Sequence, residues 1–327
     1  MKPLFMEPYF NQKDWGGTRL RDVFGKNIPS VHTGEAWEVS GYPTGPSMCE
    51  GKTLLQYMEE MGSELVGTEI HGEFPLLIKL LDAREWLSVQ VHPSDEYARR
   101  VEGDPYGKTE AWVVLDCQEG AELIFGIDCD NETLRREIAE GRLEQHLKKV
   151  PVKVGDVLYI PAGTVHAIGA NMIIYEVQQS SDRTYRLYAW GRNAELHIEK
   201  SLDVIDPKQG GKPMSGVEVP ADGGRREMLI LDPCFALERL TVDTKMDFTA
   251  DGTRFYAYTA LSDGKIAWNE GEAVFKAGQS FLIPAALGQY SILGGSLLKA
   301  YVPNIAATES ELGAKGIDSE KLGGQRK

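Results

Sequence analysis

Three polar side chains alternate with aliphatic ones in the motif Leu-Ser-Val-Gln-Val-His-Pro. Successive side chains of an extended strand point to opposite faces, so Ser88, Gln90 and His92 would project together from one face. Glu110 and His166 each adjoin another apolar strand and could add a carboxylate and a second imidazole. Catalytic zinc is held by nitrogen and oxygen donors of these kinds, with one position left open. The pattern therefore favours a divalent metal site on the inner face of a sheet.

Each of these residues has a simpler role when it is taken alone. A lone histidine near a strand end usually makes a hydrogen bond, and the amide oxygen of Gln90 would be a weak ligand. The prediction rests on the combination. Residues 102–108 form a charged loop that returns the chain to the same sheet before Glu110. Residues 155–163 likewise form a strand and a tight turn before His166.

Short apolar strands at regular spacing predict a mainly β fold, a sandwich or barrel rather than repeated βαβ units. The expected strands cover residues 36–41, 76–81, 86–92, 111–115 and 121–127. Two helices interrupt the strands, at residues 53–61 and 131–147. In the second helix, Asn131 would be the N-cap, and leucine and isoleucine residues form an apolar stripe.

A stretch rich in glycine and proline, residues 207–224, predicts a linker between two domains. Residues 1–206 would form the first, metal-binding domain, and residues 225–310 the second. Residues 311–327 would form a tail with a poorly ordered end.

The predicted second domain contains an internal echo of the first. Residues 278–289 align without gaps to residues 155–166, which places Gln289 where His166 stands. No histidine occurs after His197. We therefore expect a second copy of the same β fold that lacks the metal ligands.

The formal charge of −14 argues against a nucleic acid partner, because a phosphate backbone requires a concentrated basic surface. The same charge would repel a small anionic substrate. A site for such a substrate needs a local group of cations, and Lys79, Lys108, Arg183 and Arg186 lie near the predicted metal strands. For Arg183, an ordinary surface charge is the favoured interpretation.

No segment of the sequence approaches the ~18 uninterrupted apolar residues that a membrane helix needs. The N-terminal apolar patch is broken by Pro3, Glu7 and Pro8, so no export signal is expected. The 4 cysteines are far apart and form no Cys-x-x-Cys pair, which favours reduced thiols. We therefore expect a cytoplasmic protein with no membrane partner.

Several motifs together resemble type I mannose-6-phosphate isomerases and look most like the short bacterial form. The resemblance runs from about Pro3 to Tyr301, nearly the whole chain. Its most specific part is Ser-Val-Gln-Val-His-Pro, followed by Lys-x-Glu and later by Gly-Thr-x-His. The motifs that carry it are Trp-Gly-Gly (15–17), Gly-Glu-Ala-Trp-Glu-Val-Ser (34–40), Pro-Leu-Leu-Ile-Lys-Leu-Leu (75–81), Leu-Ser-Val-Gln-Val-His-Pro (87–93), Gly-Lys-Thr-Glu-Ala-Trp (107–112), Pro-Ala-Gly-Thr-Val-His (161–166) and Ser-Asp-Arg-Thr-Tyr-Arg (181–186).

This resemblance implies two cupin-type (jelly-roll) β-barrels with short helical insertions. It also implies a zinc-dependent enzyme that interconverts mannose 6-phosphate and fructose 6-phosphate. The implied zinc ligands are Gln90, His92, Glu110 and His166. The implied residues of the substrate cleft are Ser88, Lys79, Lys108, Glu176 and Arg186. Since the second copy lacks the ligands, we expect one zinc per chain.

An aldose–ketose isomerase moves a proton from C2 to C1 of the open-chain sugar through an enediolate, and a divalent cation can polarise the oxygens involved. Arg186 is expected to stabilise the enediolate, because a guanidinium keeps its charge at any working pH. The proton carrier is left open among Glu176, a metal-bound water and Lys108. Glu176 could equally be a structural carboxylate paired with a lysine or an arginine.

Three other functions are compatible with a cupin that has this donor set. Two histidines and a carboxylate also occur in Fe(II) oxygenases. However, Gln90 as a fourth donor and the cations Lys79 and Lys108 favour an anionic sugar. A metal-dependent sugar epimerase and a non-catalytic sugar-phosphate binder are the other two alternatives. The isomerase is preferred on the resemblance, and the oligomeric state stays open.

Overall fold

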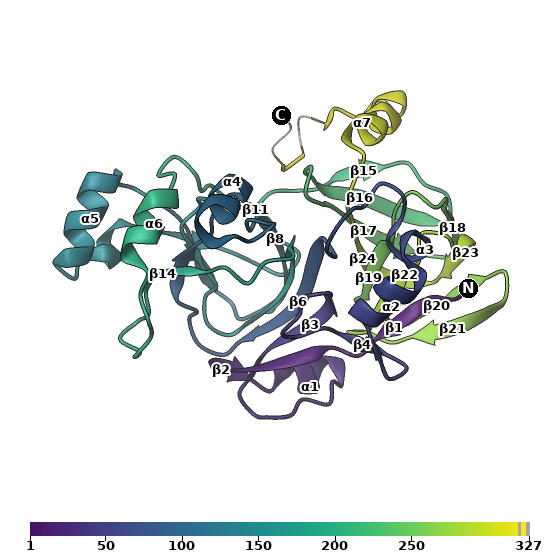
Figure 1. The fold of residues 1–327 in the computed structure, drawn as a ribbon, viewed down its shortest axis with the longest axis horizontal. Helices are drawn as coiled ribbons and strands as arrows, with labels where there is room; N and C mark the ends of the chain where they lie inside the picture. Colours follow the sequence, from purple (N-terminus) through teal and green to yellow (C-terminus); the bar gives the residue numbers. More distant parts are fainter. Residues whose placement is uncertain (320–321, 325–327) are drawn as a thin grey trace.

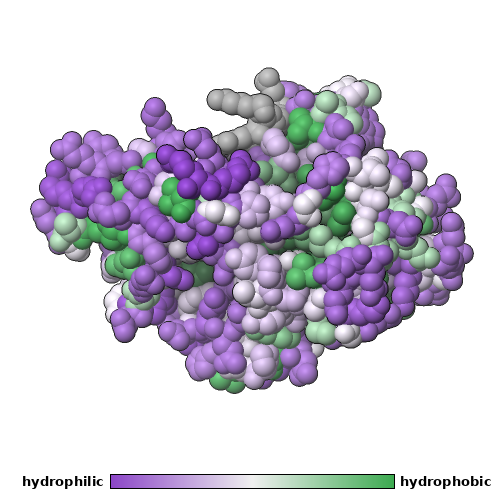
Figure 2. All heavy atoms as spheres, in the orientation of Figure 1, coloured by the Kyte–Doolittle hydropathy of each residue, from purple (hydrophilic) through white to green (hydrophobic). Residues whose placement is uncertain are grey.

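The computed structural model describes residues 1–319 and 322–324. Strands dominate it, which confirms the prediction of a mainly β fold (Figure 1). Two pairs of sheets, one from each half of the chain, lie side by side along the long axis of the molecule. On the face shown in Figure 2, hydrophilic side chains cover most of the surface, and hydrophobic ones form small separate groups. The number of closed barrels stays a prediction.

The first half of the chain forms a 6-stranded and a 5-stranded sheet. In spatial order, the 6-stranded sheet contains β11 (Val157–Ile160), β8 (Glu110–Cys117), β13 (Met172–Gln179), β6 (Leu76–Ala83), β3 (Thr33–Ser40) and β2 (Tyr9–Gly17). The 5-stranded sheet contains β10 (Leu147–Pro151), β9 (Glu122–Ile127), β12 (His166–Ala167), β7 (Val89–Val91) and β14 (Tyr185–Tyr188). A small 2-stranded sheet pairs β4 (Met48–Cys49) with β5 (Lys52–Thr53).

The second half forms a 7-stranded and a 4-stranded sheet. The 7-stranded sheet contains β1 (Leu4–Met6), β22 (Ser280–Ile283), β19 (Tyr256–Ala260), β24 (Gly295–Tyr301), β17 (Ala236–Val242), β16 (Gly224–Leu231) and β15 (Val217–Val219). The 4-stranded sheet contains β18 (Met246–Ala250), β23 (Gly288–Leu293), β20 (Gly264–Trp268) and β21 (Gly271–Phe275).

Short helices lie at the margins of the sheets (Figure 1). They are α1 (Arg19–Phe24), α2 (Leu54–Met61), α3 (Ser63–Val66), α4 (Asp95–Tyr97), the π-helical turn η1 (Ala98–Glu102), α5 (Asn131–Ala139), the 3-10 turn η2 (Leu143–His146), α6 (Ile198–Val204) and α7 (Ile305–Ala314). None of the helices in the described part of the chain has the length and apolar character needed to cross a lipid bilayer.

The two faces of the 6-stranded sheet have different neighbours. In β6, Leu76 and Ile78 are fully buried in a core that also contains Phe235 and Leu237 of the second half. Lys79, the residue after Ile78, projects from the opposite face and lines a cavity of the first half. Because side chains alternate along a strand, one strand contributes both to the core shared by the two halves and to a polar cavity.

The predicted helix at 53–61 is confirmed as α2, with Thr53 as its N-cap. The predicted helix at 131–147 is wrong in its extent and its cap. Helix α5 ends at Ala139, and Gly141, with φ of 72°, turns the chain in a left-handed conformation that ends the helix. The N-cap is Asp130, whose carboxylate accepts a hydrogen bond from the Thr133 amide at 2.8 Å.

Each of the five predicted strands overlaps an observed strand, but the strand expected at 86–92 is much shorter. Only β7 pairs with neighbours, and Ser88 and His92 flank it. Pro93, which has no amide hydrogen, follows His92 and limits the pairing on that side. The polar side chains of this segment therefore lie at and just beyond the ends of a short central strand.

The division of the chain at residues 206 and 225 into two domains stays a prediction. Strand β1, from the N-terminus, pairs with β22 of the second half. Within the predicted linker, β15 pairs with β16. Helix α7 begins before the predicted tail, and its Leu312 is fully buried. The expected poorly ordered end includes residues 325–327, which lie outside the described residues.

The echo between the two halves extends to strand order and register. The spatial orders β11-β8-β13-β6-β3-β2 and β22-β19-β24-β17-β16-β15 correspond strand by strand, because in both sheets the strands follow one another along the chain in the same sequence. One cross-strand row of the first sheet joins Leu158, Trp112, Glu176 and Lys79. The corresponding row of the second joins Phe281, Tyr258, Lys299 and Glu238.

The gapless alignment of Gln289 with His166 is wrong by one residue. Gln289 is exposed, whereas the next residue in β23, Tyr290, is buried in the core of the second half. Neighbouring side chains of a strand point to opposite faces, so one extra residue in the preceding turn exchanges them. A tyrosine, not a glutamine, therefore stands at the inner position in the second half.

A buried ion pair at the junction of the two halves provides a test of the fold. Lys26 Nζ lies 2.6 Å from Glu38 Oε1 of β3, and the two side chains are 8% and 0% exposed. Lys26 also donates to the Gly278 carbonyl, just before β22, at 2.7 Å. Lys26→Met should lower the free energy of unfolding by about 3–5 kcal/mol, because it leaves a buried carboxylate without its cation. Guanidinium denaturation measures this change.

Two controls accompany that measurement. The double variant Lys26→Met, Glu38→Gln removes both charges and should recover much of the loss. Lys52→Met removes one member of an exposed pair with Glu60 and should change stability little. Equal losses in the single and double variants would show that the ion pair is not the cause.

Candidate active site and metal centre

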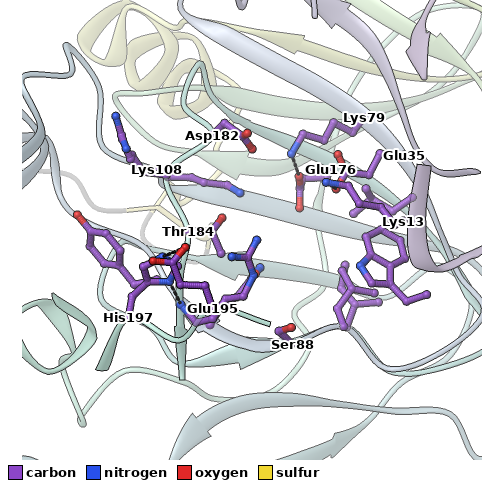
Figure 3. A pocket seen from close by; sticks show the side chains of 18 of the residues that line it. Lys13, Glu35, Lys79, Ser88, Lys108, Glu176, Asp182, Thr184, Glu195 and His197 are labelled. Carbon is purple, nitrogen blue, oxygen red and sulfur yellow. Dashed lines mark hydrogen bonds and ion pairs between the residues drawn. The ribbon is translucent and has the colours of Figure 1, made fainter. Parts of the chain in front are cut away.

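A cavity of about 430 Å³ lies between the 6-stranded and 5-stranded sheets. The side chains around it come from both sheets and from the segment before α6 (Figure 3). Seven of the residues singled out from the sequence line it: Lys79, Ser88, Gln90, Lys108, Glu176, Arg183 and Arg186. The structure therefore brings the predicted cleft residues together.

On the 5-stranded sheet, three strands bring a row of polar residues into register. His166 of β12 pairs with Gln90 of β7, and Gln90 pairs with Arg186 of β14. Residues directly opposite each other in antiparallel strands share a face, with Cβ atoms about 5 Å apart. Arg186 is thus a neighbour of the predicted ligands. Among the described residues, its guanidinium makes no hydrogen bond or ion pair with a side chain.

On the 6-stranded sheet, the facing side chains are acidic and basic. Glu110 of β8 pairs in register with Gln178 of β13. In the next row, Trp112 pairs with Glu176, which pairs with Lys79 of β6. The even spacing along each strand keeps all these side chains on the inner face.

Three predicted ligands meet in a buried cluster below the cavity. Glu110 Oε1 lies 3.2 Å from His166 Nε2, and Glu110 Oε2 lies 3.5 Å from His92 Nε2. The three side chains are between 0% and 1% exposed. The carboxylate and imidazole atoms all lie within 4.8 Å of one another, close enough to share one cation.

In each imidazole, the hydrogen bond of Nδ1 to a backbone carbonyl determines which ring nitrogen carries the proton. His92 Nδ1 donates to the Arg183 carbonyl at 2.8 Å, and His166 Nδ1 donates to the Thr164 carbonyl at 2.9 Å. Both Nε2 atoms therefore carry lone pairs that point inward. Among the described residues, His92 Nε2 and both oxygens of Glu110 have no hydrogen-bond partner. Buried nitrogen and oxygen lone pairs that converge in this way fit a bound divalent cation.

Burial disfavours charge on every member of the cluster when no cation is bound. It lowers the pKa of His166 to about 4 and lowers the pKa of His92 well below its usual value. Burial, together with the nearby Glu176 charge, raises the pKa of Glu110 to about 8. A divalent cation would reverse this last preference, because it stabilises the carboxylate.

Gln90 adjoins the cluster as a fourth donor. Its amide nitrogen lies 3.2 Å from His166 Nε2. Rotating the amide by half a turn would place Gln90 Oε1 where Nε2 now lies, because the amide oxygen and nitrogen are nearly equal in size. The residues present can thus offer two imidazole nitrogens, a carboxylate and an amide oxygen, a set that fits zinc.

Lys79 and Glu176 form a buried pair that faces the cavity (Figure 3). Lys79 Nζ lies 3.0 Å from Glu176 Oε1 and donates to Gln178 Oε1 at 2.6 Å. The Trp112 indole donates to Glu176 Oε2 at 2.8 Å. Burial raises the pKa of Glu176, but the charges of Lys79 and Lys108 outweigh it and leave that pKa below its usual value. Glu176 is therefore an ionised, oriented carboxylate at neutral pH.

Two further cations of the cavity differ in their partners. Lys108 Nζ lies 3.4 Å from Glu110 Oε2, with the side chain 4% exposed. Arg183 pairs with Asp104 and lies 3.5 Å from Glu102. Because two carboxylates neutralise Arg183, its contribution here is the backbone carbonyl that orients His92.

The sequence analysis missed several residues of the cavity. His197 Nδ1 accepts a hydrogen bond from the Arg186 amide at 3.2 Å and so flanks β14. Lys13 lies 3.3 Å from Glu35, which accepts a bond from the Trp37 indole at 2.7 Å. Glu35 belongs to the motif at 34–40, but its register opposite β6 could not be read from the sequence. The remaining missed polar residues are Glu102, Asp182, Thr184, Tyr185, Glu195 and Lys200.

The fold and this cluster define a class: a cupin-type β protein with a buried His–Glu–His centre beneath a cleft that contains several cations. The family described as phosphomannose isomerase type I, catalytic domain, matches residues 4–110. Over 306 residues the chain is 37% identical to the mannose-6-phosphate isomerase of Streptococcus mutans, which covers 90% of this chain and 96% of the relative. The mannose-6-phosphate isomerase ManA of Bacillus subtilis is 37% identical over 305 residues, with coverages of 90% and 96%.

Solved structures agree with these relatives. The crystal structure of the Bacillus subtilis mannose 6-phosphate isomerase has a TM-score of 0.86 at 34% identity and covers 92% of this chain and 99% of that one. A zinc-bound mannose 6-phosphate isomerase shares the fold, with a TM-score of 0.77 at 16% identity and coverages of 92% and 100%. The chain belongs to the type I mannose-6-phosphate isomerase family.

The tautomers of the two buried histidines can be tested directly. In ¹⁵N NMR spectra of the protein at neutral pH, His92 and His166 should both carry the proton on Nδ1 and none on Nε2, because each Nδ1 donates to a backbone carbonyl. His166→Ala and His92→Ala assign the signals. A proton on Nε2 of either ring would contradict the proposed direction of the lone pairs.

Proposed function

We propose that the chain is a metal-dependent aldose–ketose isomerase that interconverts mannose 6-phosphate and fructose 6-phosphate. The observation that carries this proposal is the row of Arg186, Gln90 and His166 beside the buried His–Glu–His cluster. It joins a metal-type donor set to a free guanidinium in one cleft. The names of the relatives from Streptococcus mutans and Bacillus subtilis support the same reaction.

In this proposal, Gln90, His92, Glu110 and His166 hold one zinc ion per chain. When bound, the ion supplies a Lewis acid near the carbonyl and hydroxyl oxygens of the open-chain sugar. The second half contributes no metal site, because tyrosine occupies the inner position that corresponds to His166.

Glu176 is our preferred proton carrier. It is ionised, it faces the cavity, and Lys79 and Trp112 hold its two oxygens in fixed directions. It would take the proton from C2 of the open-chain sugar and return it to C1, with the electron pair resting on the enediolate between these steps. Lys79 then has the role of orienting Glu176, since its ammonium already contacts Glu176 and Gln178.

Arg186 would stabilise the enediolate, whose negative charge develops at the C1 and C2 oxygens. Its position next to Gln90 places a permanent charge beside the donor cluster. Lys108 and Ser88, which line the same cavity, would contact the sugar phosphate and hold it in place. Lys108 remains the alternative proton carrier, because its ammonium has a single carboxylate partner at 3.4 Å.

We place the reaction in the cytoplasm, because the four cysteines are free thiols in the structure and disulfides are rare in that compartment. No nucleic acid or membrane partner is proposed, and the oligomeric state stays open.

An assay of mannose 6-phosphate conversion, coupled to detection of fructose 6-phosphate, tests the function. Activity should disappear with a chelator and return with added zinc. His92→Ala and His166→Ala should lose both activity and metal, and Glu110→Gln should weaken metal binding by removing the only anionic ligand. Product formation with full activity after complete metal removal would refute the proposal, as would accumulation of a C2 epimer instead of the ketose.

Elemental analysis of the dialysed protein checks the metal site, with one zinc per chain expected. Asp128, Cys129 and His146 form a second donor group near α5. Cys129→Ser is therefore the matched control and should keep the zinc content unchanged. Stoichiometric zinc retained in His166→Ala but lost in Cys129→Ser would move the site to the second group.

The role of Arg186 can be separated from that of a phosphate contact. Arg186→Ala should lower kcat by about 10²–10³, the usual effect of removing one preorganised electrostatic contact. Arg186→Lys should recover part of the loss, because it restores the charge but not the planar donor fork. Lys108→Ala should mainly raise KM. Arg135→Ala, on the exposed side of α5, is the control and should leave both constants unchanged.

Substrate truncation completes this comparison. On unphosphorylated mannose, a variant without a phosphate contact should lose its disadvantage relative to the parent, whereas Arg186→Ala should remain impaired. A wild-type kcat with only a raised KM for the phosphorylated sugar would make Arg186 a phosphate contact instead.

A further inference from the structure

The second half contains a cavity of about 430 Å³ that is lined by residues of both its 7-stranded and its 4-stranded sheet. Side chains of β16, β18, β19 and β24 line it, and α7 contributes Thr308 and Glu311. Its principal residues are Arg226, Phe248, Arg254, Tyr256, Lys299 and Tyr301. The reaction proposed for the first half uses none of them.

This cavity occupies the place in the second half that the cleft occupies in the first. Lys299 and Glu238 are cross-strand neighbours in β24 and β17, as Glu176 and Lys79 are in β13 and β6. The two charges are exchanged between the halves, but a buried Lys–Glu pair lies under the cavity in both.

Aromatic residues stand where the first half has metal donors. Tyr256 pairs with Ile283 of β22, as Glu110 pairs with Ile160 of β11, so Tyr256 takes the position of the carboxylate ligand. Tyr290 takes the inner position of His166. The second cavity therefore has a buried Lys–Glu pair beneath it, as the first has, but aromatic rings at the positions of the metal-type donors.

Lys299 is the unusual member of this pair. It is 7% exposed, and three rings surround its ammonium, with centroids at 4.4 Å for Tyr256, 5.0 Å for Tyr301 and 5.2 Å for Phe248. Of the carboxylate oxygens in the described residues, the nearest is on Glu238 at 3.7 Å, beyond hydrogen-bond distance. An ammonium carries three donors, and a buried one without acceptors is unfavourable.

Glu238 cannot satisfy Lys299, because other groups already hold it. Arg226 donates to both of its oxygens, at 2.5 and 3.1 Å, and the Tyr301 hydroxyl donates at 2.8 Å. Arg226 also reaches Glu311 of α7 at 2.7 Å. The donors of Lys299 therefore remain available to a ligand in the cavity.

The charges around the cavity indicate what kind of ligand fits. Its lining contains three cations and three carboxylates: Arg226, Arg254, Lys299, Asp247, Asp251 and Glu311. A bound anion would lie near as many carboxylates as cations, so it would gain little attraction. A bound cation would be repelled by the ammonium of Lys299. A sugar offers hydroxyl groups that both donate and accept hydrogen bonds, and its C–H faces pack on aromatic rings.

A second hollow adjoins this cavity. It has a volume of about 510 Å³ and shares Asp247, Phe248, Thr249 and Tyr290 with the first. Trp268, Asn269 and Gln289 complete one side of it, and the buried Trp268 indole nitrogen has no hydrogen-bond partner in residues 1–319 and 322–324. A second sugar unit would find an aromatic ring and planar polar groups there.

We propose that the second half of the chain binds an uncharged mono- or disaccharide, without a metal, in the cavity above Lys299. The ammonium donates to sugar hydroxyl oxygens, and the rings of Phe248 and Tyr256 cover the sugar faces. This proposal does not depend on the reaction of the first half, because it rests on the contacts of Lys299 and on the balanced charges of its own cavity.

The test uses the full-length His166→Ala protein, in which the donor set of the first half is incomplete. Methyl α-D-mannopyranoside, methyl β-D-glucopyranoside and cellobiose are titrated and followed by NMR. The two methyl glycosides cannot open to a carbonyl form and so cannot be isomerised. At least one of the three should bind saturably, and Lys299→Met should weaken that binding about tenfold or more, since it removes a charged donor.

Control variants make the outcome decisive. Lys265→Met changes an exposed lysine of β20, on the same half, and should leave binding unchanged. Phe248→Leu keeps Lys299 but removes a ring and should also weaken binding, so it replaces Lys299→Met if that variant does not fold. The proposal is overturned by the absence of saturable binding of all three ligands. It is equally overturned if Lys299→Met and Phe248→Leu both leave the binding of these ligands intact. Saturation of this cavity by mannose 6-phosphate, but by none of the three uncharged ligands, would also overturn it.

Discussion

The convergence of two imidazole nitrogens and a carboxyl group in a dry interior is the constraint on which the site depends. His92 and His166 each direct a proton outward to a backbone carbonyl, so their lone pairs face Glu110. Within the described part of the chain, the two oxygens of that carboxylate accept no hydrogen bond. Such an arrangement is unfavourable by itself and becomes favourable around a cation. The surrounding sheets must therefore hold the three side chains against their mutual repulsion.

The rigidity that this requires comes from the two-faced 6-stranded sheet. One face of β6 and β13 carries Lys79 and Glu176, and the opposite face packs into the core shared with the second half. Movement of either strand would disturb both. The buried pair of Lys26 and Glu38 fastens the same sheet to the turn before β22. The second half thus supports the geometry of the cleft without contributing a side chain to its lining.

The two halves repeat a strand order and a register while their inner faces differ. A row of the first sheet ends on Glu176 and Lys79, and the matching row of the second ends on Lys299 and Glu238. Opposite charges attract in either order, so exchanging the two residues preserves the pair. The donor positions are less tolerant, because tyrosine at the place of Glu110 removes the anionic ligand. The fold was therefore retained while the chemistry of the cavity changed.

The sequence by itself predicted the mainly β fold, five strands of the first half, helix α2 and the three residues that meet in the His–Glu–His cluster, because these follow from local periodicity and from motif composition. It did not determine the end of α5 at Ala139, before the turn at Gly141, or the inner position of Tyr290, since a single residue at a turn decides each of them. Only the tertiary structure decided that Lys79 is held by Glu176, that carboxylates neutralise Arg183, and that His197 flanks Arg186. These contacts join residues far apart in the chain, and strand register across the sheets, which no local pattern encodes, brings them together.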